Sequence, residues 1–323
     1  MNNYCVITTI NPPTKAVEVL YEKFGERLVI VADAKTPINW EYKNAVVLGS
    51  SRKDYAPLNH YARKNIGYMD AIANKADCIY DTDDDNIPND NWKIRGLKTS
   101  ITQTSNEKWC NIYEPLTSGL TWPRGFPLNL IKEKAQLEDI DGEVESSIQQ
   151  GLADDSPDVD AIWRLTNNRI VKFWIPKRIW LKNTWCPINS QSTWWFPDAF
   201  PLMYLPVNCS FRCTDIYRGL IAQRCLWTIN QGVTFHSPSE VYQDRNEHDL
   251  MKDFADEVHM YLNVEKIVEI LSDEELSSKR EGIHHTMFNC YDALVAGGVF
   301  PEAELKSLEK WLDDYTNITA NLG

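Results

Sequence analysis

The densest group of side chains that could do chemistry is an acidic cluster that follows a short apolar segment. The cluster reads Asp81-Thr-Asp-Asp-Asp-Asn86 and comes directly after Cys78-Ile-Tyr80. Carboxylates this close raise one another's pKa values and destabilise a fold unless a cation compensates them. Carboxylate oxygens are the ligands that Mg²⁺, Mn²⁺ and Ca²⁺ prefer. The cluster therefore predicts a divalent metal site, with a solvated acidic turn as the alternative.

Two other interpretations of the acidic cluster can be tested on the sequence. An EF-hand loop starting at Asp81 would need Gly at its sixth position and Glu at its twelfth. Those positions hold Asn86 and Trp92, so a calcium loop of this type is excluded. A phosphatase of the haloacid dehalogenase type would have Thr where this chain has Asp85. That class remains a minor alternative.

Basic side chains that could bind phosphate precede the acidic cluster. Arg63 and Lys64 lie in the first half of the segment 59–74, whose apolar residues recur at helical spacing. Arg contacts phosphate oxygens through two parallel hydrogen bonds, and Lys contacts them as a point charge. The segment predicts a phosphate-binding helix, and a surface helix with two exposed cations is the alternative.

The elements that must position these side chains alternate between strand and helix over the first 90 residues. Apolar, β-branched segments at 4–10, 28–32, 45–48 and 78–80 predict strands, and segments 15–24 and 59–74 predict helices. This alternation favours an α/β fold with a parallel, doubly wound sheet. Ligands bind such sheets beyond the carboxyl ends of the strands. Asp33 and the acidic cluster fall at two of those ends.

The middle of the chain gives weaker signals, and the last third reads as helical. Residues 138–160 carry nine acidic side chains and no basic one, which predicts a solvated loop or a mobile lid. Trp185, Trp194 and Trp195 are expected in the core, with stacking on a sugar as the alternative. Residues 214–230 and most of the chain from residue 250 onward are predicted to be helical.

Composition restricts the classes of partner. The 46 acidic and 33 basic side chains give a net charge of −13, which argues against a protein that coats nucleic acid. We expect no transmembrane segment, because no run of 18 apolar residues exists, and we see no signal peptide. The eight cysteines include no CxxC pair and read as buried, reduced side chains. The expected location is cytoplasmic, and peripheral attachment to a membrane stays open.

Four short motifs together resemble the STELLO-type family of glycosyltransferase-like proteins. That family is similar in turn to the reversibly glycosylated polypeptides, which are UDP-arabinopyranose mutases. The likeness runs from about Tyr4 to about Glu257. The motifs are Asn11-Pro-Pro-Thr14, Arg63-Lys-Asn-Ile-Gly-Tyr68, Tyr80-Asp-Thr-Asp-Asp-Asp-Asn86 and Arg212-Cys-Thr-Asp-Ile-Tyr-Arg-Gly219.

The resemblance implies a fold of glycosyltransferase A type, which is Rossmann-like with a mainly parallel sheet flanked by helices. The catalytic domain would cover residues 1–250, and a helical extension would cover 251–323. An Asp-x-Asp motif at Asp83, Asp84 and Asp85 would hold Mn²⁺ or Mg²⁺ on a nucleotide-sugar. The residues expected to contact that donor are Thr8, Thr9, Asp33, Arg63, Lys64 and Asn65.

The resemblance also implies roles for residues in the second half of the chain. Arg124 lies in a stretch similar to the one that holds an active-site arginine in the mutases, although an arginine in a plain turn is the alternative. Asp215 resembles the acidic residue that opens the acceptor-side helix, where it could act as general base, bind sugar hydroxyls or only cap the helix. Many enzymes of this fold complete the metal shell with a histidine. The mutases have Tyr-His where this chain has Tyr242-Gln243, so His236 or His248 is the candidate here.

The function expected from these observations is metal-dependent transfer of a sugar from a nucleotide-diphosphate sugar to a glycan or another hydroxyl acceptor. Uridine is the expected nucleotide. A mutase that interconverts the ring forms of the donor sugar is the second candidate. A domain that has lost catalysis and only binds partners is the third. The oligomeric state cannot be read from the sequence.

Overall fold

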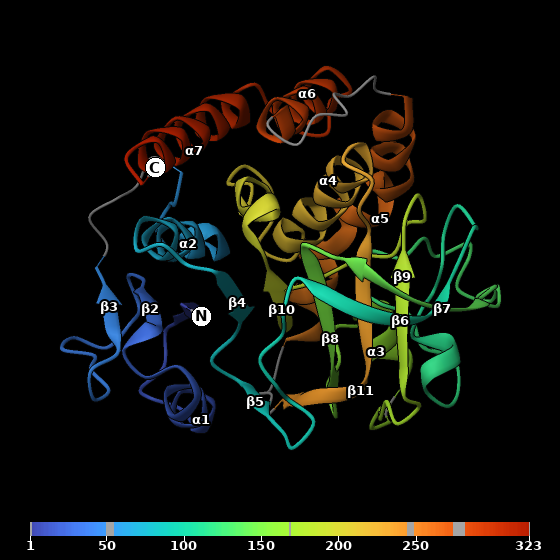
Figure 1. Cartoon of the computed structure of the whole chain (residues 1–323). Coiled ribbons are helices and arrows are strands. Elements are labelled where there is room, and N and C mark those ends of the chain that lie inside the picture. The colour runs from blue at the N-terminus through green and yellow to red at the C-terminus, as the bar shows by residue number, and fades with distance from the viewer. Residues whose placement is uncertain (1, 50–54, 168, 244–248, 274–281, 323) are drawn as a thin grey trace.

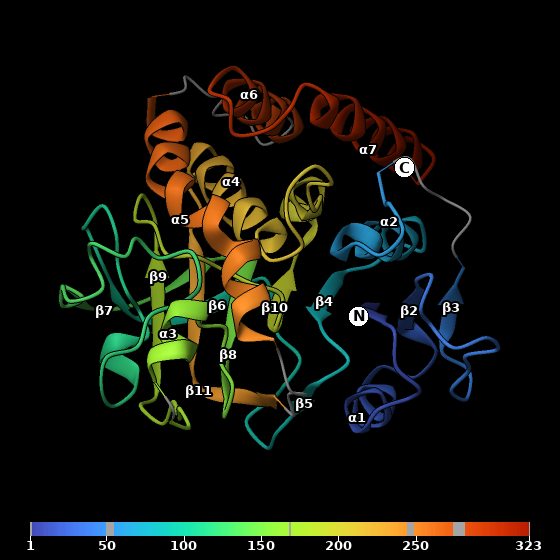
Figure 2. The same ribbon diagram turned by 180° about the vertical axis from the view of Figure 1, so that it is seen from behind.

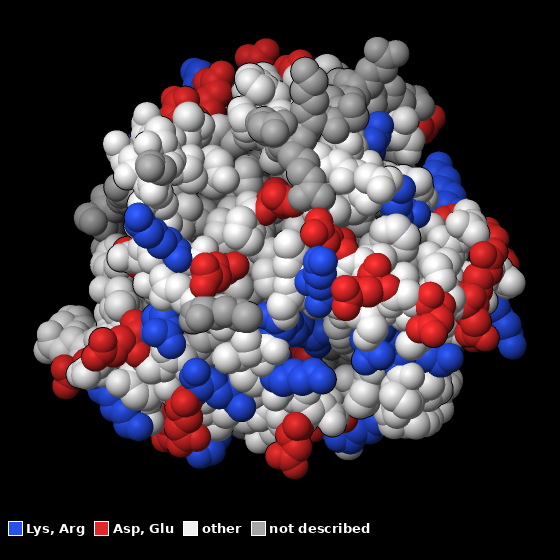
Figure 3. Space-filling model, in the orientation of Figure 1, with Lys and Arg blue, Asp and Glu red and all other residues white. Residues whose placement is uncertain are grey.

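The computed structural model describes residues 2–49, 55–167, 169–243, 249–273 and 282–322. These residues form a mixed sheet with helices packed along it (Figures 1 and 2). Acidic and basic side chains are interspersed over the face shown in Figure 3, as expected for a chain with both charges in quantity. Within the described residues, no helix is both long and apolar enough to span a bilayer.

The described residues contribute eleven strands to one sheet. The strands are β1 (Asn3–Thr9), β2 (Leu28–Ala32), β3 (Val46–Leu48), β4 (Cys78–Thr82), β5 (Asn86–Pro88), β6 (Lys98–Thr104), β7 (Glu138–Glu145), β8 (Ile148–Asp154), β9 (Lys177–Leu181), β10 (Ser192–Trp195) and β11 (Val233–Gln243).

The sheet has a parallel part and a mixed part. Its order is β3-β2-β1-β4-β10-β8-β11-β9-β6-β7, with β5 paired to β11. The first four strands are parallel to one another. β10 is antiparallel to both of its neighbours, β4 and β8, and parallel and antiparallel pairs alternate from there on. The predicted α/β class is confirmed, with its parallel strands in the N-terminal part.

The helices are α1 (Lys15–Phe24), α2 (Lys64–Ala73), α3 (Ala161–Thr166), α4 (Thr214–Thr228), α5 (Leu250–Asp273), α6 (Ile283–Ala296) and α7 (Ala303–Ala320). α1 and α2 lie on opposite faces of the parallel strands (Figure 1). Alternation along β1 explains this: Cys5 and Ile7 share a core cluster with α1, whereas Val6 shares one with α2.

The two N-terminal motifs of the sequence have structural functions in these packings. The hydroxyl of Thr14 accepts a hydrogen bond from the backbone N–H of Val17 and so caps α1. Gly67 brings α2 close to β1 and β2, because a Cβ at this position would lie 2.5 Å from a methyl carbon of Val6 and 2.7 Å from one of Val31.

The C-terminal helices form an arc along one edge of the molecule, with α7 over α2 (Figures 1 and 2). Trp311 of α7 is fully buried and lies edge to face with Tyr55. Glu304 is also fully buried, and its carboxylate accepts hydrogen bonds from the Tyr204 hydroxyl at 2.7 Å and from the backbone N–H of Asn208 at 2.8 Å. α7 is therefore tied to the segment that precedes α4.

The predicted elements of the N-terminal part and the helix at 214–230 are confirmed within a few residues. The interpretation of residues 138–160 as a solvated loop or lid is wrong for most of the segment. Its first part is the exposed strand β7, and its second part is β8, a buried strand of the mixed part of the sheet. The acidic residues of β7 face solvent, so a strongly charged sequence that predicted a loop is in fact a strand.

Candidate functional site

A cavity of about 670 Å³ opens at the carboxyl ends of the parallel strands. Its lining includes Thr8 and Thr9 from β1, Asp33 just after β2, and the cluster Asp83–Asp85 just after β4. Residues from α4, from the loop before β10 and from the N-terminal part of α5 close it from the other side. The position agrees with the general rule for ligand sites in open α/β sheets.

The three cluster aspartates turn to three different partners. Asp83 accepts hydrogen bonds from the Tyr61 hydroxyl at 2.6 Å and from Lys64 Nζ at 2.7 Å. The carboxylate of Asp84 turns back toward the end of β1, where it is bound by the Thr9 hydroxyl and by the side-chain amide of Asn11.

The third aspartate contacts the last strand of the fold. Asp85 Oδ2 accepts a hydrogen bond from Gln243 Nε2 at 3.0 Å. Gln243 is the last residue of β11, and it occupies the position where the mutases have histidine. The amide of Gln243 is therefore the side chain that this fold delivers to the acidic cluster, in place of an imidazole.

Internal cations already neutralise part of the acidic segment. Lys64 Nζ lies 2.9 Å from Asp81 and 2.7 Å from Asp83, and Arg218 Nη1 lies 3.0 Å from the other oxygen of Asp81. Asp81, Lys64 and Arg218 are fully buried. Burial opposes the charge on Lys64, but the two carboxylates outweigh it and raise the pKa of the ammonium. The cation that the cluster requires is therefore supplied for Asp81 and Asp83 in part by the protein itself, through Lys64 and Arg218.

The acidic cluster was tested for its fit to a divalent metal ion. Among the described residues, no group of three His, Cys, Asp or Glu side chains converges closely enough to form a metal site. The carboxylates of Asp83, Asp84 and Asp85 nevertheless line one cavity, and oxygen donors of this kind suit Mg²⁺ or Mn²⁺. All three carboxylates accept hydrogen bonds from the protein, and that of Asp84 is turned back toward the end of β1. Asp83 and Asp85 are therefore the candidate metal ligands.

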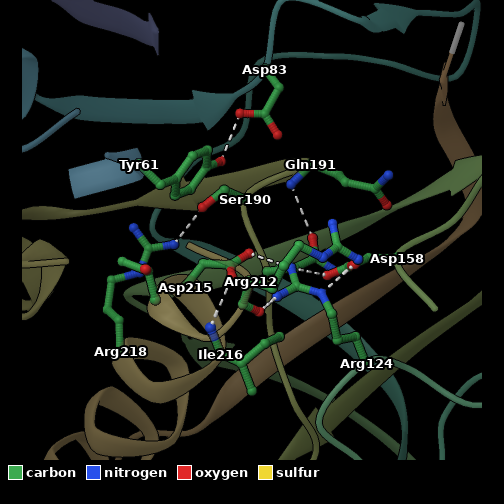
Figure 4. Close-up of polar contacts among 12 residues, drawn as sticks. Tyr61, Asp83, Arg124, Asp158, Ser190, Gln191, Arg212, Asp215, Ile216 and Arg218 are labelled. Atoms are coloured by element: carbon green, nitrogen blue, oxygen red, sulfur yellow. Dashed lines mark hydrogen bonds and ion pairs between the residues drawn. The ribbon is translucent and has the colours of Figure 1, made fainter. Parts of the chain in front are cut away.

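Arg124 lies at the centre of a second network in the cavity wall (Figure 4). Its Nε and Nη2 atoms donate to the two carboxylate oxygens of Asp158 at 2.8 and 2.9 Å, and Nη2 also donates to Asp215 at 2.9 Å. Nη1 donates to the backbone carbonyl of Arg212. Paired carboxylates outweigh the effect of burial and raise the pKa of Arg124, so the guanidinium stays charged. The network fixes its plane and position.

Asp215 lies in the first turn of α4 and is almost fully buried. Burial favours its neutral form, but Arg124, Arg218 and Arg212 outweigh burial and lower the pKa of the carboxyl. A carboxylate with a lowered pKa takes up a proton weakly, so it is a weak general base. The geometry favours Asp215 as the group that holds Arg124 or accepts hydrogen bonds from sugar hydroxyls.

Three of the expected donor-binding residues do not line the cavity. Arg63 is fully buried and its guanidinium donates to backbone carbonyls, including those of Ala32 and Ala56. Asn65 is also buried and its amide donates to the carbonyls of Tyr55 and Leu205. Lys64 is buried as well, and its ammonium pairs with Asp81 and Asp83. The three residues lie at the start of α2, where the helix is buried on all sides, so their side chains bind within the protein and do not reach the cavity.

The predicted histidine ligand is also placed elsewhere. His236 lies in a second pocket, beside Arg95 and Arg178, and not with the aspartates. His236 lies near the start of β11, before a register shift between His236 and Val241, whereas the end of the strand at Gln243 is the part that reaches the aspartates. His248 lies outside the described residues.

The tryptophan-rich stretch forms core. Trp185, Trp194 and Trp195 are each at most 2% exposed, so none of them presents a face to a sugar in the cavity. Tyr61 and Phe211 do line the cavity; they lie edge to face, and Phe211 is 52% exposed. An exposed aromatic ring at a cavity rim can stack on the C–H face of a sugar.

The sequence did not single out Asp158, Tyr61 or Gln243 as site residues. Asp158 lies in the acidic stretch; the resemblance includes the segment Asp158-Val-Asp160 but gives Asp158 no role, and its spacing before an apolar run could have indicated a helix cap. Asp160 does cap α3. Tyr61 carried no signal in the sequence. Gln243 was noted only as a departure from the Tyr-His pair of the mutases, because its contact with the acidic cluster comes from the tertiary fold.

Comparisons with known proteins agree with the resemblance inferred from the motifs. The family model for STELLO glycosyltransferases matches residues 212–322. "Probable glycosyltransferase STELLO1" from Arabidopsis thaliana is 27% identical over 343 residues, and "Probable glycosyltransferase STELLO2" is 26% identical. Each match covers 96% of this chain and 44% of the relative, so the chain spans less than half the length of these curated relatives.

The structural comparison is looser. The mannosyltransferase PcManGT from Pyrobaculum calidifontis, solved with GDP-Man and Mn²⁺, overlaps with a TM-score of 0.40 at 9% identity. The overlap covers 99% of this chain and 85% of that protein. The resemblance of this chain to STELLO glycosyltransferases is confirmed by the sequence matches.

Proposed function

We propose that this chain is a metal-dependent glycosyltransferase that moves a sugar from a nucleotide-diphosphate sugar to a hydroxyl acceptor. One observation carries the proposal. A single cavity at the carboxyl ends of β1, β2 and β4 is lined on one side by Asp83 and Asp85 and on the other by Arg124 with Asp215. The similarity to proteins named as probable glycosyltransferases supports it.

The nucleoside of the donor would lie over the ends of β1 and β2. Thr8, Thr9 and Asp33 line this side of the cavity. The Asp33 carboxylate is held by the backbone N–H groups of Ala34 at 2.6 Å and Asn59 at 2.7 Å, so it has a fixed orientation for a ribose or base contact. Uridine is the nucleotide that we place there first.

Asp83 and Asp85 would hold Mn²⁺ or Mg²⁺ against the diphosphate. When bound, such an ion stabilises the negative charge that develops on a leaving diphosphate. Lys64 and Tyr61 keep Asp83 in place, and Gln243 does the same for Asp85. These contacts position the two carboxylates before any donor arrives.

Arg124 and Asp215 would bind the transferred sugar. Arg124 stays charged and its plane is fixed by Asp158, so it can orient an oxygen of the sugar or of the diphosphate without reorganisation. Asp215 would accept hydrogen bonds from sugar hydroxyls. The exposed ring of Phe211 offers an apolar surface to the sugar or the acceptor.

The proposal is tested by isothermal titration of the protein with UDP, GDP and CMP and with their common sugar conjugates, each with Mn²⁺ and with EDTA. We expect one nucleotide class to bind, and only with metal. The double variant Asp83→Asn/Asp85→Asn should lose this binding, whereas the matched double variant Asp90→Asn/Asp313→Asn, at two exposed positions, should keep it. Equal donor affinity in both double variants would overturn the assignment of the metal site.

Product analysis separates transfer from the alternatives. A transferase releases nucleotide diphosphate only when an acceptor is present, whereas a mutase changes the ring form of the donor and releases none. A domain that has lost catalysis would bind donor and give neither product. The expected division into residues 1–250 and 251–323, and the cytoplasmic location, stay predictions.

A further inference from the structure

A second pocket lies away from the donor cavity, between the segment that follows β5 and the strands β6, β9 and β11. Its volume is about 270 Å³, and it shares no lining residue with the first cavity. This volume is near the lower end of the range for small-molecule sites. The charged and titratable residues that line it are Lys93, Arg95, Lys177, Arg178, His236 and Glu240. In Figure 3, Lys and Arg side chains gather around a hollow in the lower central part of the face shown.

The described lining of this pocket carries four cationic side chains and one carboxylate, in a chain with a net charge of −13. Glu240 is already engaged, because it forms an ion pair with Arg95 and accepts a hydrogen bond from the Ser192 hydroxyl at 2.6 Å. Lys93, Lys177 and Arg178 form no ion pair with any residue that the structure describes. Positive charge is therefore concentrated here, and only that of Arg95 is compensated by a carboxylate of the lining.

Several polar atoms around the pocket are buried without a hydrogen-bond partner. They are Arg95 Nε, Arg178 Nε, His236 Nε2 and Ser237 Oγ. Arg95 is 8% exposed and Ser237 is 7% exposed, so water reaches them poorly. Buried donors without partners are costly and rare in folded proteins. A ligand that presents oxygen acceptors would satisfy those of these atoms that a side-chain rotation brings to the surface of the pocket.

The surroundings of His236 point to the same ligand chemistry. Burial lowers the pKa of its imidazole, and the nearby charges of Arg95, Arg178 and Lys93 lower it further. A metal cation would be repelled by these three side chains, whereas an anion would be attracted. The positive potential that disfavours the imidazolium is the potential that favours a bound anion.

We propose that this second pocket binds a tetrahedral oxyanion, either free phosphate or sulfate or the phosphate group of a small ester. Arg95 and Arg178 would donate hydrogen bonds to its oxygens, Ser237 would add a neutral hydroxyl donor, and Lys93 and Lys177 would supply charge at the rim. The site is independent of the donor cavity and of the reaction proposed there.

The test is isothermal titration of the whole chain at low ionic strength with sodium sulfate, sodium phosphate, glucose 6-phosphate and glucose. We expect sulfate and phosphate to bind once per chain and glucose not to bind. Tighter binding of glucose 6-phosphate than of phosphate identifies an ester as the ligand, and equal binding identifies the free anion. Absence of binding by all three anions would overturn the proposal.

Location is tested by paired variants. Lys177→Gln/Arg178→Gln should weaken sulfate binding at least about tenfold, because it removes two charged donors. The matched variant Lys132→Gln/Lys134→Gln removes two exposed cations that do not line the pocket. It should bind sulfate like the unmodified protein. If both double variants bind sulfate with unchanged affinity, the anion lies elsewhere and the pocket is not the site.

A second measurement does not depend on affinity. The imidazole signals of His236 can be assigned by their loss in His236→Asn, and their pKa can be followed by nuclear magnetic resonance with and without sulfate. Because Lys93, Arg95 and Arg178 face this imidazole and Glu240 is paired, a bound dianion should raise its pKa. A pKa that is the same with and without bound sulfate would contradict binding in this pocket.

Discussion

The two pockets manage charge in opposite ways. In and beneath the wall of the donor cavity, buried cations and carboxylates are paired within the protein, as Lys64 is with Asp81 and Asp83 and as Arg124 is with Asp158 and Asp215. In the second pocket, most cations lack a protein partner and several donors are unsatisfied. The first arrangement positions side chains before a ligand arrives, and the second relies on a ligand for its compensation.

The largest effect should follow removal of the cation at the centre of the paired region. Lys64→Met would leave Asp81 and Asp83 with one fewer buried partner, and breaking a buried pair in this way costs about 3–5 kcal/mol. Urea unfolding measures the loss. Lys15→Met, at an exposed ion pair, is the control and should unfold at the same urea concentration as the unmodified protein. A small loss in Lys64→Met would show that the pairing in the donor cavity is not needed for the fold.

Arg124 should matter more to turnover than any other charge of the second network. Arg124→Gln removes the charged group that the proposed function places against the sugar, and we expect kcat to fall about 100-fold. Arg124→Lys restores the charge but not the bidentate pair with Asp158, so its recovery should be partial. Circular dichroism shows whether both variants fold. Full activity in folded Arg124→Gln would remove Arg124 from the site.

The pH dependence of stability tests the effect of burial on the carboxyl of Asp160. Burial raises the pKa of this carboxyl from 3.8 to about 6, although Trp163 N–H and the Trp122 indole donate to it. The folded state then holds a proton that the unfolded state releases, so stability should fall as pH rises from about 4 to about 6. The shift corresponds to at most about 3 kcal/mol.

The pH effect is measured as the difference in unfolding free energy between pH 4 and pH 7, with Asp160→Asn as the comparison. Asparagine still caps α3 and does not titrate, so the variant should lose less stability over this range than the unmodified protein. The same slope in both proteins would mean that Asp160 titrates as it does in the unfolded chain.

The smallest expected effect is a gain in stability, whereas Lys64→Met is expected to lose stability. Arg178→Gln removes a cation from a group of like charges that have no anion to pair with, so it should leave the protein equally stable or stabilise it by about 0.5 kcal/mol at low salt. Salt screens such repulsion, and the gain should disappear at about 1 M ionic strength. Destabilisation comparable to that of Lys64→Met would show that the two pockets do not differ as described.

The part of the fold that the sequence predicts well is the part in which local pattern and tertiary position agree. β1, α1 and β2 are continuous apolar or amphipathic segments with a Thr14 cap, so their periodicity identifies them. β7 and β8 were missed because exposed acidic residues on one strand obscured the other. The site residues divide in the same way. Asp33 and the cluster at the end of β4 could be identified because they follow predicted strands. Asp158 and Gln243 could not, because they reach the cavity from segments distant in the sequence.

The inward face of α2 shows why some predicted site residues were wrong. A basic residue next to an acidic strand end suits a phosphate site, but it equally suits a buried partner for an aspartate. Lys64 follows the second course, whereas Arg63 donates to backbone carbonyls. Only the burial of these two residues in the fold distinguishes their roles from phosphate binding.

The buried carboxylate of Glu304 has a consequence for how the molecule opens. It accepts hydrogen bonds from the backbone N–H groups of Val207 and Asn208, which lie shortly before the Phe211 side of the donor cavity. These two amides can exchange their hydrogens with solvent only when α7 moves away from this segment. Their exchange rates are therefore a local reporter of whether the last helix is docked, and they connect the integrity of the C-terminal helices to the wall of the cavity.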